Sequence, residues 1–427
     1  MVAVVTGLLL SASLPRAACA DDAHAFAKGA EPPLDEHRLD KVIVPVAGGD
    51  SDLGFGAGAL VSFTKLVPGF KPYRWRIEGA GFFTFKKQPS HFETPYQDAS
   101  ISITFPGLLE GRLRFGILPY FTRSTALGYN GVGNASVETR PWLAFDPSKQ
   151  ADRYEAARKL TEYSLTLAGL KVDGRFELYA PVYVAASASY QESWIGVYAG
   201  SELASDRAGD HGAHVRALVE GPAQHGVVLF EYALVIDTRD DETSPTQGVF
   251  QKFAIRQSPG GNDALPYTYN AVSMTARVYQ PIWGRHISLA GRFVGDVLFG
   301  KTPFYQLARY DEGWAVGGVD GVRGVPAQRY YGKRKVFGNL ELRTEMPSFK
   351  VFSKEITLGV VGFFDAGRVW ADDLSAPELD GTTLGLKYGV GGGLRLRIGK
   401  PFVLRADVAW SPDAHPVGGY FKAGQTF

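Results

Sequence analysis

Several segments of this 427-residue chain place an apolar side chain at every second position and charged side chains between them. In residues 394–398, leucine and isoleucine alternate with Arg395 and Arg397. A helix turns about 100° per residue and would mix the two kinds of side chain, whereas a strand separates them onto opposite faces. The same alternation occurs in residues 340–343 and 402–410. The chain is therefore predicted to consist of β-strands with one apolar face and one charged face.

The length of these segments separates two kinds of β protein. A soluble antiparallel sheet with one wetted face, as in a lectin sandwich or a propeller, also alternates, but its strands average about 5–6 residues. Strands that cross a membrane need about 9–11 residues. The segments 73–86, 112–123, 227–238 and 286–299 are longer, which favours a barrel with a lipid-facing wall around a polar lumen. Aromatic residues also gather near segment ends, as in the girdles at membrane interfaces; they are Tyr73, Trp75, Phe82, Phe83, Phe85 and Trp410.

Loop lengths support the barrel, because membrane barrels alternate short turns on one side with long loops on the other. The connections 106–110, 173–174, 239–247, 281–285, 347–353 and 399–400 are short, and the interleaved connections 125–157, 196–225, 300–332 and 368–383 are long. The expected strands lie near 41–47, 53–65, 71–86, 97–105, 111–124, 158–172, 175–195, 226–237, 248–258, 268–280, 286–299, 333–346, 354–367, 384–398, 401–410 and 418–427. The sequence therefore predicts an all-β, transmembrane antiparallel barrel of about 16 strands with both ends on the periplasmic side.

The first residues have the features of an export signal. Residues 2–14 are apolar but too few to span a bilayer, and Ala18-Cys19-Ala20 supplies the small residues that a signal peptidase reads. Lipidation of Cys19 is the alternative, which Arg16 disfavours because it stands where such a motif has an aliphatic residue. Cleavage would remove the only cysteine and exclude disulfides from the mature protein. We expect a signal peptide at 1–20, a short periplasmic tail at 21–40 and the barrel at 41–427.

The overall charge argues against nucleic acid as a partner. The 45 basic and 44 acidic side chains give a formal net charge of +1, so the chain lacks the excess of positive charge with which proteins bind a phosphate backbone. After residue 20, no apolar run approaches the ~20 residues that a membrane-spanning helix requires. An exported chain of this kind is therefore either a soluble extracytoplasmic protein or a membrane barrel, and the alternation favours the barrel.

Four stretches of the C-terminal half carry a family resemblance. They are Ile236–Asp240 with Pro245–Gly248, the motif Gly317–Gly324, the strand Gly362–Trp370 and the terminal Phe421–Phe427, with a weaker match at Tyr129–Asn134. Together and in this order they resemble the BamA/TamA superfamily of bacterial surface-antigen barrels. The resemblance implies a barrel in the bacterial outer membrane, with the 300–332 loop folded back into the lumen. It also implies outer-membrane lipid as the surroundings and the barrel-assembly machinery as a partner during biogenesis.

The same resemblance assigns a role to the loop motif Val322-Arg323-Gly324. It implies that the guanidinium of Arg323 enters the lumen and meets Asp365, with Phe363 packed beside it. A planar fork of five donors can clamp a carboxylate through two bonds and hold the loop as a plug. An ordinary solvated ion pair is the alternative.

Two further expectations concern single positions. Glu341 and Arg343 share one face of their strand by the alternation, so both are candidates to line the lumen. The terminal Phe427 matches the assembly signal with which substrates of the barrel-assembly machinery end.

The sequence departs from the family in two places. Val325 follows Gly324 where the family has an aromatic residue, which puts that packing contact in doubt. Typical members carry periplasmic POTRA modules before the barrel, whereas only about 20 residues precede the first expected strand here, so we expect a barrel that lacks POTRA domains. Without these modules, a full protein-assembly role does not follow from the resemblance, and whether a separate periplasmic partner replaces them stays open.

Motifs for catalysis or metal binding are weak. The sequence contains no His-Glu-x-x-His, no paired-cysteine site and no Gly-x-Ser-x-Gly. His211 and His214 are spaced for a metal pair but lie in an expected long loop rich in glycine and charge, and Asp372, Asp373 and Asp380 fit a solvated acidic loop better than a calcium site. We therefore expect no catalytic residues, no metal and no cofactor.

Three functions remain open at this point. The first is a conduit or insertase for a polypeptide or lipid client, with the lumen plugged by the 300–332 loop. In this reading strand 41–47, which contains Pro45, pairs poorly with strand 418–427 and leaves a seam that can open sideways. The alternatives are a passive or gated pore for small solutes and a barrel hydrolase.

Overall fold

The computed structural model describes residues 38–50, 54–67, 73–87, 92–242, 244–284, 286–351, 354–374, 376–398, 402–413, 417–423 and 425–427. The expected signal peptide at 1–20 and all but the last residues of the expected tail at 21–40 lie outside these residues. The first strand begins at Arg38, slightly before the expected start at residue 41.

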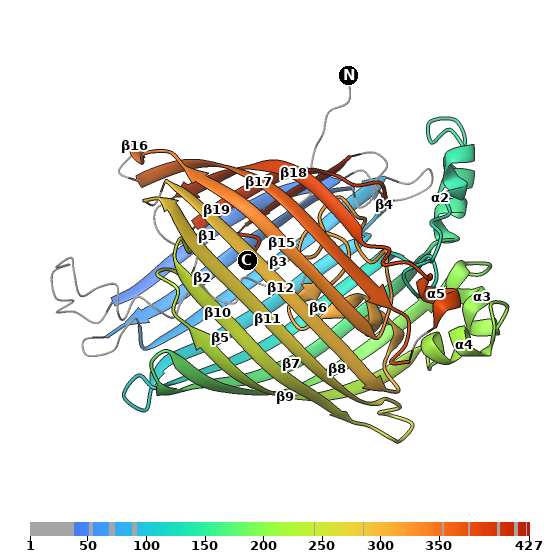
Figure 1. Cartoon of the computed structure of the whole chain (residues 1–427), viewed down its shortest axis with the longest axis horizontal. Coiled ribbons are helices and arrows are strands. Elements are labelled where there is room, and N and C mark those ends of the chain that lie inside the picture. The colour runs from blue at the N-terminus through green and yellow to red at the C-terminus, as the bar shows by residue number, and fades with distance from the viewer. Residues whose placement is uncertain are drawn as a thin grey trace.

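One large antiparallel sheet makes up the molecule (Figure 1). Within the described residues it contains 18 strands, two of which are very short, β4 (Phe92–Glu93) and β16 (Phe349–Val351). The long strands number sixteen, as the sequence predicts, and their order in the sheet follows the chain. They are β1 (Arg38–Asp50), β2 (Gly54–Leu66), β3 (Trp75–Lys87), β5 (Tyr96–Leu108), β6 (Leu113–Gly128), β7 (Glu162–Tyr179), β8 (Val182–Val197), β9 (Gln224–Asp237), β10 (Gly248–Pro259), β11 (Thr268–Trp283), β12 (Ile287–Gly300), β15 (Arg334–Glu345), β17 (Lys354–Trp370), β18 (Lys387–Ile398), β19 (Phe402–Trp410) and β20 (Gly418–Ala423).

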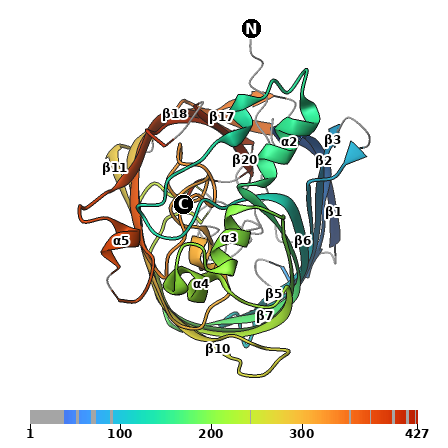
Figure 2. The same ribbon diagram turned by 90° about the vertical axis from the view of Figure 1, so that its right-hand side faces the viewer.

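The sheet curls into a barrel whose two ends differ (Figures 1 and 2). The four long loops, 129–161, 198–223, 301–333 and 371–386, all lie at one end, which we call the loop end; the opposite end, where only shorter connections join the strands, is the turn end. Among the described residues, backbone pairing links each long strand to the next from β1 to β20, but no pairing joins β20 back to β1. The predicted barrel of about 16 strands is confirmed, and its ladder is open between the first and last strands.

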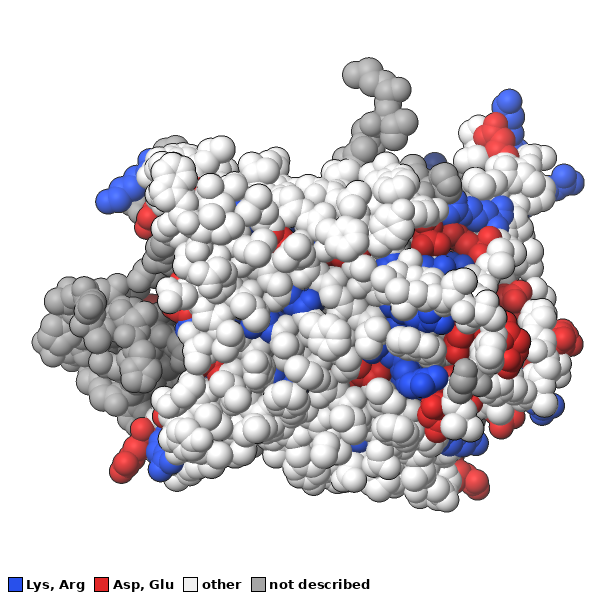
Figure 3. All heavy atoms as spheres, viewed as in Figure 1, with Lys and Arg blue, Asp and Glu red and all other residues white. Residues whose placement is uncertain are grey.

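Burial is inverted relative to a soluble protein, as a lipid-facing wall requires. On β15, Leu340 and Leu342 are 48% and 46% exposed, whereas Glu341 between them is fully buried. Most of the strand wall between the two ends is correspondingly uncharged in Figure 3, apart from small blue and red patches, and charged side chains gather mainly at the loop end. Two aromatic residues of the expected girdles, Tyr73 and Phe82, are instead buried, so the aromatic prediction is wrong at these positions.

One predicted turn is wrong. Asp173-Gly174 has typical turn composition, but β7 continues through it to Tyr179, and the chain turns at Ala180-Pro181 before β8. The neighbouring strand explains the difference: β6 begins at Leu113 and offers ladder partners to β7 as far as Phe176. Pairing along a complete neighbour therefore outweighs the local turn preference.

The loop end carries the helices (Figure 2). The β6–β7 loop contains η2 (Pro141–Ala144) and α2 (Ala151–Lys159), and the β17–β18 loop contains α5 (Pro377–Asp380). Residues 198–223, which we call the cap, contain α3 (Glu202–Ala208) and α4 (Ala213–Val219) and lie across the opening. No helix in the described part of the chain is long and apolar enough to cross a membrane.

Candidate functional site: a plug loop and its lumen lock

The segment that joins β12 to β15, residues 301–333, runs inside the barrel and is called the plug loop here (Figure 2). It begins with η3 (Phe304–Ala308) and forms a small hairpin from β13 (Arg309–Tyr310) and β14 (Gly313–Trp314). Its tip turns sharply at Gly324, whose φ of +91° favours glycine. A Cβ at this position would also lie 3.0 Å from the backbone of Trp410. The tip therefore lies directly against the barrel wall.

Arg323 at the tip is completely buried. Its Nε and Nη2 donate to the two carboxylate oxygens of Asp365 at 2.7 and 2.9 Å, and its backbone N–H donates to the same carboxylate at 3.1 Å. The ring of Phe363 lies under the guanidinium, with its centroid 3.5 Å from Cζ. The structure thus brings together the three residues that the family resemblance links.

The third guanidinium nitrogen of Arg323 reaches two further strands. Nη1 donates to Glu341 Oε1 of β15 at 2.7 Å and to Asp407 Oδ2 of β19 at 3.3 Å. It also donates to the hydroxyl of Thr426, beyond β20, at 3.2 Å. One side chain of the plug loop therefore binds three wall strands and the segment that follows the last strand.

Additional arginines balance the buried carboxylates. Arg343 donates to Glu341 at 2.8 Å, and Arg395 pairs with both Glu341 and Asp407. Buried charges of this kind are stable only when each has a partner, and three arginines here face three carboxylates. We call this neutral cluster the lumen lock; it consists of Arg323, Glu341, Arg343, Asp365, Arg395 and Asp407.

Strand β18 makes room for the lock by presenting glycine inward. Gly389 pairs with Asp365 and Gly391 with Phe363 in the β17–β18 ladder. A Cβ at Gly389 would lie 1.8 Å from the carbonyl oxygen of Arg323. The glycines of this strand therefore provide the space that the plug tip occupies.

Apolar packing supports the tip. Val322 and Val325 are fully buried and pack in one cluster with Val316, Phe337 and other wall and loop residues. Val325 stands where the family has an aromatic residue, and its side chain nevertheless packs in this cluster.

Charged wall residues hold the rest of the plug loop. Lys252 contacts Asp311, Arg277 contacts Glu312, and Arg292 donates to the carbonyl of Asp320. The plug loop is therefore anchored by the wall along much of its length and not only at its tip.

The end of the chain turns into the lumen. Strand β20 ends at Ala423, so the expected strand 418–427 is too long. Phe427 is buried against Tyr279, and its main-chain oxygen accepts from Arg343 at 3.0 Å. In β20 itself, the hydroxyl of Tyr420 accepts from the backbone N–H of Gly324 at 2.7 Å. The last strand and the plug tip are thus in direct contact.

The two histidines of the cap have different partners. His211 Nδ1 lies 2.6 Å from Asp206 Oδ1, and hydrogen bonding to Asp206 outweighs burial and raises the pKa of His211. His214 Nε2 lies 2.8 Å from Asp372 of the β17–β18 loop instead. Burial raises the pKa of Asp372, but hydrogen bonds from Lys333 and His214 outweigh burial and hold it well below its usual range. The two histidines therefore do not form the pair that their spacing suggested.

Sequence reasoning missed several contacts of the lock. It placed Asp407 on the charged face of its strand but did not connect it to Arg323, and it assigned no role to Tyr420 or Thr426. The alternation in 402–410 was the available signal for Asp407, because an inward carboxylate near the end of the barrel is a natural partner for a plug arginine. Nothing in the sequence pattern distinguishes Tyr420 or Thr426.

An antiparallel wall that is apolar outside and charged inside, with one of its own loops in the lumen, defines a plugged membrane β-barrel. The chain belongs to the Omp85 superfamily: residues 57–427 match the Omp85 superfamily domain. The family resemblance seen in the motifs is thereby confirmed, and the protein is an outer-membrane β-barrel of a superfamily of insertases and translocation barrels.

Solved structures share this fold. BamA from Haemophilus ducreyi lacking POTRA domains 1–3 superposes with a TM-score of 0.55 at 12% identity, covering 91% of this chain and 70% of that one. CdiB from Escherichia coli superposes with a TM-score of 0.56 at 12% identity, covering 93% of this chain and 63% of that one. At these identities the likeness concerns the fold alone. A comparison with curated proteins finds no match.

Proposed function

We propose that this barrel is a conduit or insertase that delivers a polypeptide or lipid client to the outer membrane, and that the seated plug loop is its closed state. The observation that carries the proposal is the position of Arg323. It is bonded at the same time to the wall carboxylates of β15, β17 and β19 and to Thr426, next to the last strand.

The open ladder supplies the route into the bilayer. Strand β20 has only six residues, and no pairing joins it to β1 within the described residues. Pro45 lies within β1 opposite Ala59 of β2, and proline lacks the N–H that a further ladder would need. An unpaired edge of this kind is a place where a client strand or lipid can leave the lumen sideways.

The plug and the seam between β1 and β20 are mechanically coupled. Gly324 of the plug tip donates to Tyr420 of β20, and Arg323 donates to Thr426 three residues after β20 ends. Movement of β20 away from the lumen therefore breaks contacts of the lock, and release of the lock frees β20. We propose that unplugging and lateral opening occur together.

Conductance and client insertion test this mechanism together. In planar bilayers, we expect low conductance from the native protein and a large increase from Arg323→Ala. In proteoliposomes, the native protein should speed the membrane insertion of an unfolded barrel polypeptide. Arg239→Ala is the matched control, because Arg239 makes the same two-bond pair with Asp237 in the β9–β10 turn, and its other contacts, with Glu242 and Phe250, are not with the plug loop.

Three outcomes would contradict the proposal. If Arg323→Ala conducts no better than Arg239→Ala, the loop does not gate the lumen. A steady open conductance of the native protein without any effect on client insertion would indicate a small-solute pore. Turnover in a substrate screen would indicate a barrel hydrolase.

We further propose that residues 1–20 direct export and that the barrel-assembly machinery reads the terminal segment that ends in Phe427. A separate periplasmic partner is expected to present the client. Crosslinking in intact outer membranes followed by pull-down tests this directly, and recovery of neither a client polypeptide nor a periplasmic protein would argue against it.

A further inference from the structure

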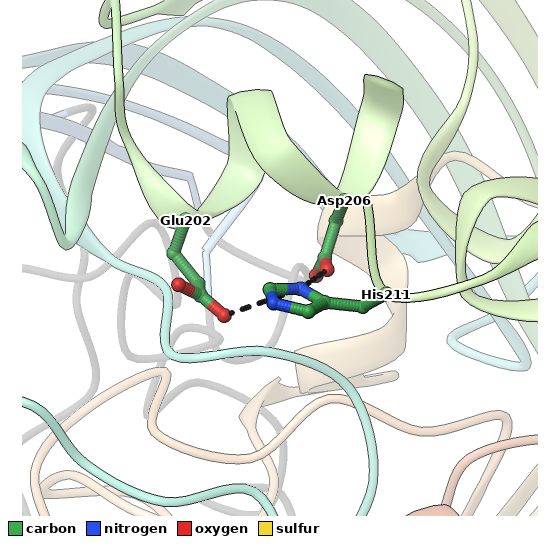
Figure 4. A group of neighbouring side chains, drawn as sticks. All are labelled: Glu202, Asp206 and His211. Carbon is green, nitrogen blue, oxygen red and sulfur yellow. Dashed lines mark hydrogen bonds and ion pairs between the residues drawn. The ribbon is translucent and has the colours of Figure 1, made fainter. Parts of the chain in front are cut away.

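Three side chains of the cap converge on one point outside the lumen lock (Figure 4). Glu202 and Asp206 are four residues apart on α3 and so lie on one face of this helix. The helix ends at Gly209, whose φ of +93° turns the chain back and brings His211 against the same face. His211 Nδ1 lies 2.6 Å from Asp206 Oδ1 and 3.6 Å from Glu202 Oε1. One ligand atom from each residue lies within 4.8 Å of the others.

The carboxylate of Asp206 is oriented by a hydrogen bond from a residue outside these three. Its side chain is almost fully buried, and its second oxygen, Oδ2, accepts from the hydroxyl of Tyr129. Oδ1 is thereby directed toward His211. Outer hydrogen bonds of this kind orient the carboxylates that bind metal ions in proteins.

The chemistry of the three groups points to one class of ion. Calcium and magnesium prefer sites made only of oxygen, whereas one imidazole with two carboxylates suits a divalent transition-metal ion, of which zinc is the one that needs only four ligands in a tetrahedron. Zinc binds nitrogen and oxygen ligands at about 2.0–2.2 Å, so neighbouring ligands of a tetrahedral ion lie roughly 3.3–3.5 Å apart. The 3.6 Å separation of His211 and Glu202 already fits, and the half-exposed imidazole of His211 must move back by less than an ångström from Asp206.

We propose that Glu202, Asp206 and His211 form a zinc site in the cap, with water as the fourth ligand. The ion takes the place of the proton between His211 and Asp206. This goes beyond the conduit function, and its failure would leave that proposal intact.

The site has a structural consequence for the plug loop. Tyr129, which holds Asp206, packs edge-on against Phe304 and Tyr331 of the plug loop, with ring centroids 6.2 and 5.0 Å away. An ion bound by α3 and His211 therefore stiffens the cap at the point where it contacts the plug loop.

Zinc binding to the purified full-length barrel in detergent tests the proposal. We expect one equivalent by calorimetric titration with Zn²⁺ alone, and X-ray absorption should show nitrogen and oxygen ligands at about 2.0–2.2 Å. His211→Ala and Glu202→Gln should each weaken binding at least ~10-fold, and Tyr129→Phe should weaken it about 10- to 100-fold through the lost outer hydrogen bond.

His214→Ala is the matched control. This residue is a histidine of the same cap, equally exposed at the surface, but it contacts Asp372 and Glu378 and not the proposed ligands. It should bind zinc like the native protein. The proposal is overturned if the native protein binds no zinc, if His211→Ala binds as well as His214→Ala, or if Ca²⁺ displaces Zn²⁺ at equal concentration.

Discussion

Removal of Arg323 offers the sharpest test of the lumen lock. The substitution Arg323→Ala deletes both side-chain bonds to Asp365 and the bonds to Glu341 and Asp407. The lock then has two arginines for three carboxylates and carries a net charge of −1 in a buried position. Removing one partner of a buried ion pair costs about 3–5 kcal/mol, because the other charge remains desolvated.

This cost appears in the equilibrium between seated and released plug loop. Since each 1.4 kcal/mol is tenfold, the released fraction should rise roughly 140- to 3,700-fold. Hydrogen exchange reports this directly, because the N–H of Gly324 at the plug tip is bonded to the hydroxyl of Tyr420 on β20 and loses this partner when the loop is released. We expect its exchange to accelerate by the same factor.

Two further variants isolate the cause. Asp365→Asn in the Arg323→Ala background removes the stranded charge, so the double substitution should cost about 0.5–3 kcal/mol less than the sum of the single ones. Arg239→Ala breaks a similar pair with Asp237 and should leave the exchange of Gly324 unchanged. The reasoning is refuted if Arg323→Ala accelerates this exchange less than tenfold, or if the control accelerates it equally.

Three other perturbations follow from the structure. Gly389→Ala places a Cβ 1.8 Å from the carbonyl oxygen of Arg323 at the plug tip and should raise conductance. Gly362→Ala on the adjacent strand places a Cβ with no atom within 4 Å and should leave conductance unchanged. Equal conductance of the two variants would show that the space at Gly389 does not hold the plug tip in place. Tyr420→Phe deletes the bond from β20 to the plug tip and should favour seam opening by about 0.5–1.5 kcal/mol, measured by client insertion, with the outward-facing Tyr388→Phe as a silent control. The pKa of Asp372 is lowered in the folded protein, so the ionised carboxylate stabilises the cap at any pH above its usual pKa of 3.8, and this stabilisation is lost only as the pH falls below that value. Asp372→Asn should therefore increase hydrogen exchange in residues 198–223 at pH 7. Unchanged exchange would contradict this.

Much of the wall could be predicted from the sequence because a membrane barrel repeats one rule along every strand. Charged side chains such as Arg395 and Asp407 must face the lumen, so a period of two identifies each strand and its inward face. The prediction of a turn at 173–174 was wrong because the length of a strand depends on its neighbour as well as on its own residues. The partner of β7 extends past this dipeptide, so β7 continues through it.

The contacts of the site were harder to predict from the sequence. The pairing of Arg323 with Asp365 followed from a family resemblance, not from the pattern itself. The approach of Tyr420 to Gly324 depends on how far the barrel curls and on where β20 ends, which local sequence does not encode. The cap was expected as an irregular loop, because α3 and α4 have only seven residues each and too few periodic positions to be recognised.

The base of the plug loop and its tip are held by different forces, and we expect this difference to decide how the loop leaves the lumen. Near β12, Phe304, Tyr305 and Leu307 belong to a large apolar cluster with cap residues such as Leu203 and Leu218. Separating this cluster exposes apolar surface to water, which costs about 25 cal/mol of free energy per Å². At the tip, where Val322 and Val325 add a smaller apolar contact, entering water solvates the guanidinium and carboxylates as they part, so each broken ionic contact is partly replaced. We therefore expect the tip to leave first and the aromatic base to act as the hinge of the movement.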